Sequence, residues 1–287
     1  MTHSAALQAG FGTSDWKKQL PTLPAVVMKL NDLLADARVG QAEVAEVLAS
    51  DPVLTAKVLR LVNSSYYGVP GGVSDIQKAL AFLGFETVSQ VVLSVGVLSA
   101  FPVESSEEFS FEGFWIHSFG VAILAQDLSK KRGDQKSAPA FTAGLLHDIG
   151  KLVLHEINPK AFFQVVKEAR DQAQSFLGAE TKLSLPGHTE LGAAMIQEWG
   201  IPGEVADCVL HHHDVEDASS LVTKTVSLAN DLMRFFQVGQ SGDFSLSKEE
   251  WATRFRDLSI PFEDSKKGLQ SMRSIAEKAE ELYRAYR

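Results

Sequence analysis

Histidine is unevenly distributed along this chain of 287 residues, and its spacing is the clearest chemical signal in the sequence. Of the eight histidines, all except His3 lie between positions 117 and 213. Imidazole nitrogens are good ligands for iron, manganese and zinc, and carboxylate oxygens complete such sites. The clustered residues are His117, His147, His155, His188, His211, His212 and His213. This clustering predicts a metal site built from the middle of the chain.

An adjacent histidine and aspartate stand at the centre of this stretch, inside the apolar segment 144–151, GLLHDIGK. Burying His147 and Asp148 is costly unless a partner satisfies them, and a metal ion does so. Gly150 lets the backbone approach another helix or a ligand closely. Lys151, one turn further on, is expected to direct a cation toward a phosphate. In this interpretation Asp148 and Lys151 are the candidate catalytic residues.

The other candidate ligands fall on separate predicted helices, which is how helical bundles build metal centres. His117 precedes the central pair, His188 opens a later helix, and His212 with His213 ends the next one. Asn230 and Asp231 lie on the helix after that. We expect the histidines at 147, 188, 212 and 213 to share one coordination sphere with the aspartate at 148, with His117 close by. The alternative is a set of core histidines that only form hydrogen bonds.

Two histidines fit the site less well than the others. His155 is expected to be partly exposed near a helix end. Three consecutive residues cannot all face one point on a helix, because each residue turns the chain by about 100°. His211 is therefore less suited as a ligand than His212 and His213.

The elements that must position these residues are predicted to be helices throughout, with no alternating strand pattern of useful length. Asp51 and Pro52 provide an N-cap and a first-turn proline, and Gly84 interrupts an apolar helix. The fold class is therefore predicted to be all-α, a compact two-lobed helical bundle. Helices are predicted over 87–100, 111–131, 138–156, 159–175 and 266–287, capping boxes at Ser74–Gln77 and Ser247–Glu250, and a surface loop over 237–247.

Composition excludes several classes of function. A net charge of −9 opposes general binding of a nucleic-acid polymer. The most apolar stretch, 88–101, is too short and too often interrupted by polar residues to span a membrane. No signal peptide is expected at the N-terminus. The one cysteine, Cys208, is expected to be buried and apolar, and it suits a reducing cytoplasm.

Three further segments resemble the HDOD family, which is related to the HD superfamily of metal-dependent phosphohydrolases. They are LPTLP at 20–24, SDPVLTAKVLRLVNSSYYG at 50–68, and the apolar helix 76–85. The resemblance divides the chain into an N-terminal extension, 1–17, an HDOD domain, 18–236, and a C-terminal helical tail, 237–287. It implies a front lobe over about 18–103 and an HD-like lobe over about 111–236.

The resemblance also carries over most of the family's site residues. The matching positions are His117, His147, Asp148, Lys151, His188, His212 and His213. The final acidic ligand departs from the pattern, because Asn230 takes its place. Asp231 could replace that ligand only if the helix turned by about 100°. The Gly-Tyr-Pro signature of related cyclic-di-nucleotide phosphodiesterases does not follow His213, where the chain reads DVEDASS.

The resemblance implies a bacterial, cytoplasmic signal-transduction module, and three functions remain open. In the first, the chain binds other signalling proteins, and any metal is structural or vestigial. In the second, it is a metal-dependent phosphohydrolase for a cyclic dinucleotide or another phosphoester, with one or two metals that activate water and polarise a phosphoryl oxygen. In the third, the site holds no metal. The missing signature and Asn230 favour the first. Iron or manganese is the expected metal, with zinc as the alternative.

A module of this kind needs a surface that a partner protein can bind. Candidate surfaces are the segment 60–68 and the C-terminal helix. Tyr66 and Tyr67 are either exposed aromatic contacts of the type that interfaces favour or side chains packed between the two lobes. Neither a nucleic-acid polymer nor a membrane is expected as a partner.

Overall fold

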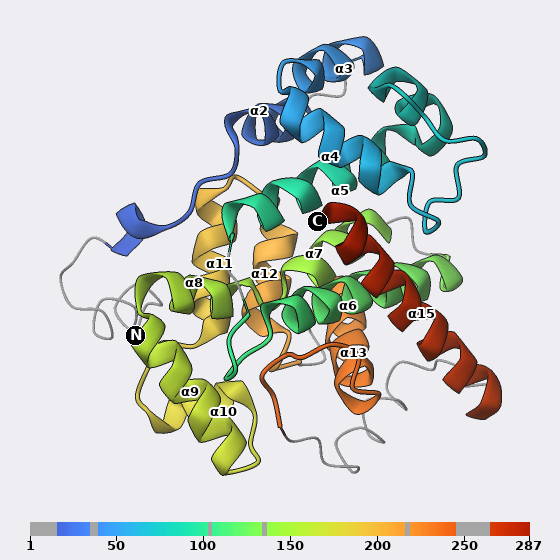
Figure 1. Ribbon diagram of the computed structural model, residues 1–287. Coiled ribbons are helices and arrows are strands. Elements are labelled where there is room, and N and C mark those ends of the chain that lie inside the picture. The colour runs from blue at the N-terminus through green and yellow to red at the C-terminus, as the bar shows by residue number, and fades with distance from the viewer. Residues whose placement is uncertain (1–15, 35–39, 103–104, 134–136, 216–218, 245–264) are drawn as a thin grey trace.

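The chain forms helices arranged in two groups, in a computed structural model that describes residues 16–34, 40–102, 105–133, 137–215, 219–244 and 265–287. No strand occurs in these residues, which confirms the predicted all-α class. Figure 1 shows α2, α3 and α4 at one end of the molecule, with α5 between them and the later helices. In chain order the elements are η1 (Trp16–Gln19), α2 (Ala25–Leu34), α3 (Gln41–Ala49), α4 (Pro52–Val62), α5 (Ile76–Ala100), α6 (Phe111–Lys131), α7 (Ser137–Leu146), α8 (Ile149–Ile157), α9 (Pro159–Asp171), α10 (Phe176–Lys182), α11 (His188–Glu198), α12 (Gly203–His211), α13 (Leu221–Phe235) and α15 (Ser265–Tyr286).

The front group, α2 to α5, has boundaries set by local capping. The Asp51 carboxylate accepts hydrogen bonds from two amides of the first turn of α4, at 3.0 and 2.9 Å, and Pro52 begins the helix as predicted. The predicted cap of α5 is wrong by one residue. Asp75, rather than Ser74, accepts from the amide of Lys78 at 2.8 Å. Both residue types are good N-caps, so composition alone does not choose between neighbours.

Helix α5 is the element that joins the two groups. It is broken at Gly84, as predicted, where the backbone takes φ +79° and ψ 166°. Helix α5 is long and apolar enough to cross a membrane, but half of its most apolar stretch is buried inside the protein. It packs against α2, α3, α4 and α7. These contacts are those of a core helix.

The second group is built around α6, whose predicted bounds, 111–131, are confirmed. Ser110 caps α6 by accepting from a first-turn amide at 2.9 Å. The predicted single helix over 138–156 is wrong, because α7 and α8 are separated at His147 and Asp148. Helix α7 lies so close to α6 that a Cβ on Gly144 would be 2.8 Å from the Cα of Ala122. The chain must then turn so that α8 can pack against α11.

Helix α15 lies across both groups, because it packs against α6 and also against α4 (Figure 1). The helix predicted over 266–287 is confirmed, with bounds Ser265–Tyr286. The Lys57 ammonium lies 4.7 Å from the ring centre of Tyr286. Glu281 accepts hydrogen bonds from the backbone amide and the hydroxyl of Ser65. The buried apolar face of α15 consists of Met272, Ile275, Ala279, Leu282 and Tyr283.

The tyrosine pair in the connection between α4 and α5 is half-buried. Tyr66 and Tyr67 meet edge to face, with ring centres 4.8 Å apart, and both pack against the hydrophobic core. The Lys278 ammonium of α15 lies 6.0 Å from the ring centre of Tyr66. Of the two interpretations of these tyrosines, the structure supports packing.

The segment that follows α13 is a loop, as predicted over 237–247, but its described part, 237–244, lies only partly at the surface. Ser241 and Gly242 are buried. Gly239 lies against α6, and a Cβ there would be 2.4 Å from the amide nitrogen of His117. Glycine, serine and aspartate are common in exposed turns, which explains the error. The capping box predicted at Ser247–Glu250 lies outside the described residues.

Candidate metal centre

The break between α7 and α8 turns two polar side chains into the core. His147 and Asp148 are both fully buried. Nδ1 of His147 lies 2.8 Å from the carbonyl oxygen of Gly144. A carbonyl only accepts hydrogen bonds, so Nδ1 carries the proton and Nε2 keeps its lone pair. That Nε2 lies 3.2 Å from Oδ2 of Asp148.

Close contact between α8 and α11 brings the next ligand into place. Gly150 faces α11 so closely that a Cβ would lie 1.8 Å from the carbonyl oxygen of His188 and 2.6 Å from the amide of Gly192. The predicted role of Gly150 in a close helix approach is thereby confirmed. The approach sets Nε2 of His188 at 3.3 Å from Oδ1 of Asp148.

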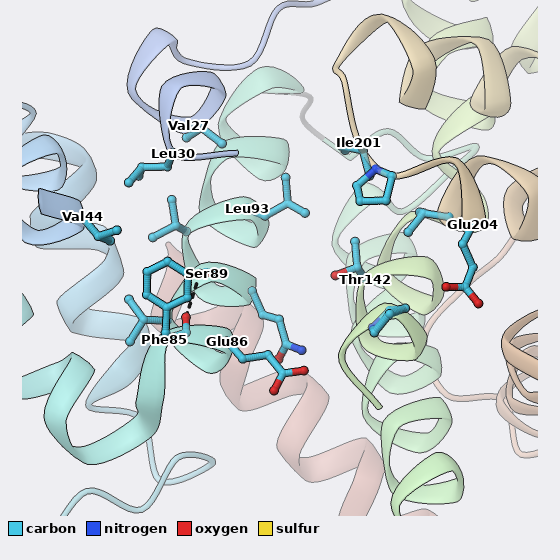
Figure 2. A pocket seen from close by; sticks show the side chains of 16 residues that line it. Val27, Leu30, Val44, Phe85, Glu86, Ser89, Leu93, Thr142, Ile201 and Glu204 are labelled. Carbon is cyan, nitrogen blue, oxygen red and sulfur yellow. Dashed lines mark hydrogen bonds between the residues drawn. The ribbon is translucent and has the colours of Figure 1, made fainter. Parts of the chain in front are cut away.

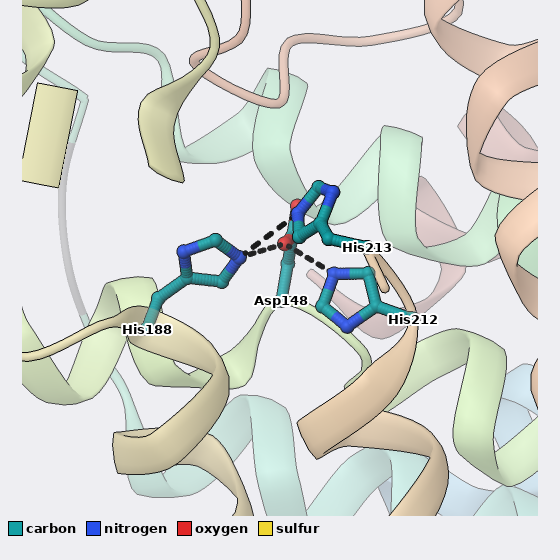
Figure 3. A group of neighbouring side chains, drawn as sticks. All are labelled: Asp148, His188, His212 and His213. Carbon is teal, nitrogen blue, oxygen red and sulfur yellow. Dashed lines mark hydrogen bonds and ion pairs between the residues drawn. The ribbon is translucent and has the colours of Figure 1, made fainter. Parts of the chain in front are cut away.

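The histidine pair that directly follows α12 completes the cluster. Nε2 of His212 lies 3.6 Å from Oδ1 of Asp148, and Nε2 of His213 lies 3.2 Å from Nε2 of His188. Figure 3 shows these four side chains directed toward a common point. Each offers one ligand atom, and these atoms all lie within 4.8 Å of one another. A second group of the same kind consists of His117, His147 and Asp148. Asp148 is common to both groups.

Several atoms of the cluster have no hydrogen-bond partner, which is the best test of whether a metal fits. They are Nε2 of His147, Oδ1 of Asp148 and Nε2 of His212. Nδ1 of His212 lies 2.8 Å from the carbonyl oxygen of Val209, so its Nε2 also keeps its lone pair. The two ring nitrogens are buried acceptors without a donor, which is costly. Oδ1 of Asp148 has one possible donor nearby, Nε2 of His188, at 3.3 Å. The donor set therefore fits a divalent cation.

The structure chooses between the two candidates on α13. Oδ1 of Asn230 lies 3.0 Å from Nε2 of His117, and both residues are 1% exposed. Asp231 instead pairs with Arg234 at 3.5 Å and belongs to neither ligand group. The expectation that Asp231 is a metal ligand is therefore corrected. An amide oxygen can bind a metal, but it brings no negative charge to the site.

Lys151 is not placed as expected. Its ammonium donates to Oδ2 of Asp148 at 2.7 Å, to the carbonyl of Ser241 at 2.9 Å and to Oδ2 of Asp243 at 3.0 Å. The three N–H donors of a lysine are thereby used within the protein. The side chain is fully buried. The expectation that Lys151 directs its charge toward a phosphate is corrected, because in this structure it holds Asp148 and the 237–244 segment together.

Two acidic residues that the sequence analysis missed support the cluster. Asp243 binds Lys151, and its Oδ1 accepts from the amide of Phe176 at 2.9 Å. Glu180 accepts from the amide of His188 at 2.9 Å and lies 2.8 Å from its Nδ1. A carboxylate on the second ring nitrogen orients a ligating histidine. Neither residue has a sequence signal, because Asp243 stands among turn residues and Glu180 on a short helix that was not predicted.

The burial expected for three residues outside the cluster agrees with the structure. His155 is half-buried between aromatic side chains and lies outside both ligand groups. His211 is 44% exposed at its side chain and lies 3.8 Å from Asp207. Cys208 is fully buried, and burial raises the pKa of its thiol. None of these three belongs to the cluster.

Burial controls the charge of two ligand histidines. It lowers the pKa of His117 to about 3 and that of His212 to about 4. Both are therefore neutral imidazoles near pH 7, which is the form that binds metals. Burial also lowers the pKa of His213 well below its usual range.

At His188 and Asp148, neighbouring charges outweigh the effect of burial on the pKa. Burial opposes protonation of His188, but Glu180 and Asp148 more than offset it and raise its pKa to about 9. Burial likewise opposes ionisation of Asp148, but the Lys151 ammonium, at 2.7 Å, holds the pKa of Asp148 well below its usual range. A metal that binds Nε2 of His188 must therefore displace a proton.

The metal-free protein is expected to be most stable near pH 6.5. Below that pH the unfolded chain protonates histidines that the fold keeps neutral, down to about pH 3 for His117 and about pH 4 for His212. These two histidines lower stability by about 2.7 kcal/mol per pH unit, at about 1.4 kcal/mol each, and His213 adds to the fall. Above pH 6.5 the fold retains the proton of His188 up to about pH 9, so stability falls as pH rises.

Urea denaturation of chelator-treated protein between pH 5 and pH 9 measures this profile. The variant His188→Gln is expected to remove the decline above pH 6.5. Stability that stays constant from pH 6.5 to 9 in the unmodified protein would contradict a protonated His188.

The fold and the cluster define the class of this protein, a helical protein with a buried histidine–aspartate site of the HD type. Residues 20–215 match the model of the HDOD domain family. The chain therefore belongs to the HDOD family, as its front motifs and its central His-Asp pair predict.

Curated relatives share parts of the chain. An uncharacterized protein from Treponema pallidum is 27% identical over 221 residues, which is 75% of this chain and 42% of that protein. Ribonuclease Y from Thermus thermophilus is 31% identical over 142 residues, which is 50% of this chain and 19% of the enzyme. The chain thus spans less than half the length of these relatives.

Solved structures of similar fold cover nearly the whole chain. An HDOD domain protein from Geobacter sulfurreducens superposes with a TM-score of 0.79 at 26% identity, covering 98% of this chain and 97% of that chain. Two proteins from Shewanella amazonensis, described as predicted phosphohydrolases, give a TM-score of 0.75 at 24% identity (97% and 100% covered) and 0.66 at 18% (99% and 100%). At these identities the latter two show the common fold alone.

Proposed function

We propose that this protein is a bacterial, cytoplasmic signal-transduction module of the HDOD type that acts through contacts with other signalling proteins and retains a divalent metal as a structural part of its core. The observation that carries the proposal is the arrangement of Lys151. All three of its donors are used inside the protein, two of them by Asp148 and Asp243. Because the Lys151 ammonium is bound to carboxylates of the protein itself, this centre is suited to stabilising the fold.

The metal would be held by nitrogen and oxygen donors alone. Asp148 is shared by a group with His117 and His147 and by a group with His188, His212 and His213. Such a donor set suits iron or manganese, with zinc as the alternative. When bound, a metal of this kind supplies Lewis acidity and fixes the positions of its ligands. Elemental analysis of the purified protein tests whether it is present.

We predict little or no turnover of cyclic-di-GMP, even when iron or manganese is supplied. Hydrolysis needs groups that hold the scissile phosphate in line, and Lys151 has no donor left for this task. Asn230 also leaves the ligand set with one negative charge fewer than an aspartate would give. Metal-loaded protein is incubated with cyclic-di-GMP, and the products are separated by chromatography.

The matched control is the double variant His147→Ala, Asp148→Ala. Linear product that forms with the unmodified protein and disappears in this variant would make hydrolysis the primary function. The companion variant Asn230→Asp restores a carboxylate beside His117. Activity that appears only in that variant would indicate that the protein has lost an ancestral hydrolase activity and retains the fold for signalling.

The second candidate function is a metal-dependent phosphohydrolase. It is favoured by the near-complete ligand set and by the match of half the chain to ribonuclease Y, an enzyme that by its name cleaves RNA. The net charge of −9 opposes an RNA polymer as substrate. The assay therefore includes a short RNA and a simple phosphodiester, bis(4-nitrophenyl) phosphate, beside the cyclic dinucleotide.

A further inference from the structure

A cavity of about 320 Å³ lies between the two groups of helices, lined by residues other than those of the histidine–aspartate cluster. One wall comes from α2, α3 and α5, and the other from α7, α12 and the turn before α12 (Figure 2). Pockets of roughly 300 to 1,000 Å³ are typical of small-molecule sites, and such sites often lie where two parts of a fold meet. The cavity therefore has the size and the place of a ligand site.

The walls of this cavity are mainly apolar. Leu30 and Phe85 line one side and Ile201 the other (Figure 2). Two of the polar lining residues already have partners within the protein. The Ser89 hydroxyl donates to a carbonyl of its own helix at 2.7 Å, and the Gln90 amide oxygen accepts from a glutamine of α6 at 3.3 Å. An apolar molecule can therefore enter without leaving these groups unsatisfied.

The charge of the lining has one sign. Glu86 of α5 and Glu204 of α12 stand on opposite walls, as Figure 2 shows. Among the described residues that line the cavity there is no lysine, arginine or histidine. Carboxylates beside an apolar wall favour a bound cation and repel an anion. We propose that this cavity binds a small apolar molecule that carries an amine or another cationic group.

The same walls connect the cavity to the metal centre. Thr142 lies on α7, which ends directly before His147. Glu204 lies near the start of α12, which ends directly before His212. A ligand held between α5 and these two helices fixes their positions, and rigid helices carry a displacement to their ends. Amine binding and metal binding are then coupled, and the coupling is reciprocal. This coupling, unlike the binding site, rests on the proposed retention of a metal.

Displacement of a neutral fluorescent probe tests the site in the full chain. N-phenyl-1-naphthylamine is bound first and then displaced by octylammonium or by octanoate, which differ in the sign of their charge. Octylammonium is expected to bind at least about tenfold more tightly, and the double variant Glu86→Gln, Glu204→Gln is expected to abolish the difference. The double variant Glu277→Gln, Glu280→Gln on α15, with side chains 69% and 45% exposed, is the charge-matched control and should keep the preference. Equal binding of the two ions would overturn the proposal.

A cavity-filling variant distinguishes probe binding in the cavity from probe binding elsewhere on the apolar surface. Thr142→Trp is expected to abolish probe binding while the helical circular dichroism stays unchanged. Phe82→Ser removes an aromatic ring that is 62% exposed and does not line the cavity, so probe binding should persist. Probe binding that survives Thr142→Trp would overturn the site. If a basic amphipathic peptide binds to the cavity and octylammonium does not, the occupant would be a helix of a partner protein, and the small-molecule proposal would be overturned.

The coupling has its own test. Octylammonium affinity is measured in the metal-loaded and the chelator-treated protein, and we expect the two values to differ several-fold. Identical affinities would overturn the coupling. A protein that never contains metal would contradict the proposed function. The displacement experiment, with its charge variants and its cavity-filling variant, would still show whether the cavity binds an amine.

Discussion

Replacement of Asp148 by asparagine is expected to remove the bound metal and to lower the free energy of unfolding by about 3–5 kcal/mol, the usual cost of breaking a buried ion pair. Asp148 belongs to both ligand groups and lies 2.7 Å from the Lys151 ammonium, and both side chains are fully buried. Asparagine keeps the shape of the side chain, so a cavity does not contribute. Urea denaturation gives the stability, and elemental analysis gives the metal content.

Two control variants separate the metal from the ion pair. Asp243→Asn also removes a carboxylate from Lys151, at 3.0 Å, but Asp243 is in neither ligand group, so this variant should lose stability and keep the metal. Asp207→Asn changes a side chain that is 56% exposed and should alter stability by less than about 0.5 kcal/mol. Full metal content in Asp148→Asn protein would contradict the assignment of Asp148 as the shared ligand.

Replacement of Gly150 by alanine is expected to destabilise the protein by about 3 kcal/mol, at the upper end of the usual cost of overpacking. The new Cβ would lie 1.8 Å from the carbonyl oxygen of His188 and 2.6 Å from the amide of Gly192. Both are backbone atoms, so no side-chain rotation relieves the contact. Helices α8 and α11 must separate, which moves His188 away from Asp148. Metal affinity should therefore fall together with stability.

The control for this substitution is Gly203→Ala at the start of α12. A Cβ at Gly203 meets no atom within 4 Å, so stability and metal content should stay close to those of the unmodified protein. Thermal denaturation and metal titration of both variants give the comparison. A Gly150→Ala protein with unchanged stability would show that α8 and α11 are not in close contact.

The all-α class and several helix boundaries follow from the sequence alone, because their causes are local. Asp51 and Pro52 act within one turn of α4, and the apolar periodicity of 111–131 extends along one helix. The candidate ligands His117, His188 and His212 were recognisable because metal chemistry restricts the residue types that can serve. The His-Asp pair and the front motifs also indicate the family, because they are local sequence patterns.

Only the tertiary structure decided how the site is built. The break at His147 lies inside an apolar stretch, and periodicity does not mark it because both sides of the break are buried. The choice of Asn230 over Asp231 depends on the rotation of α13 relative to α6. Asp243 comes into the core from 92 positions beyond Lys151, and its pairing with that lysine removes the charge that the sequence assigned to a phosphate. Contacts between residues so far apart depend on the packing of whole helices, and the local pattern around each residue does not contain that information.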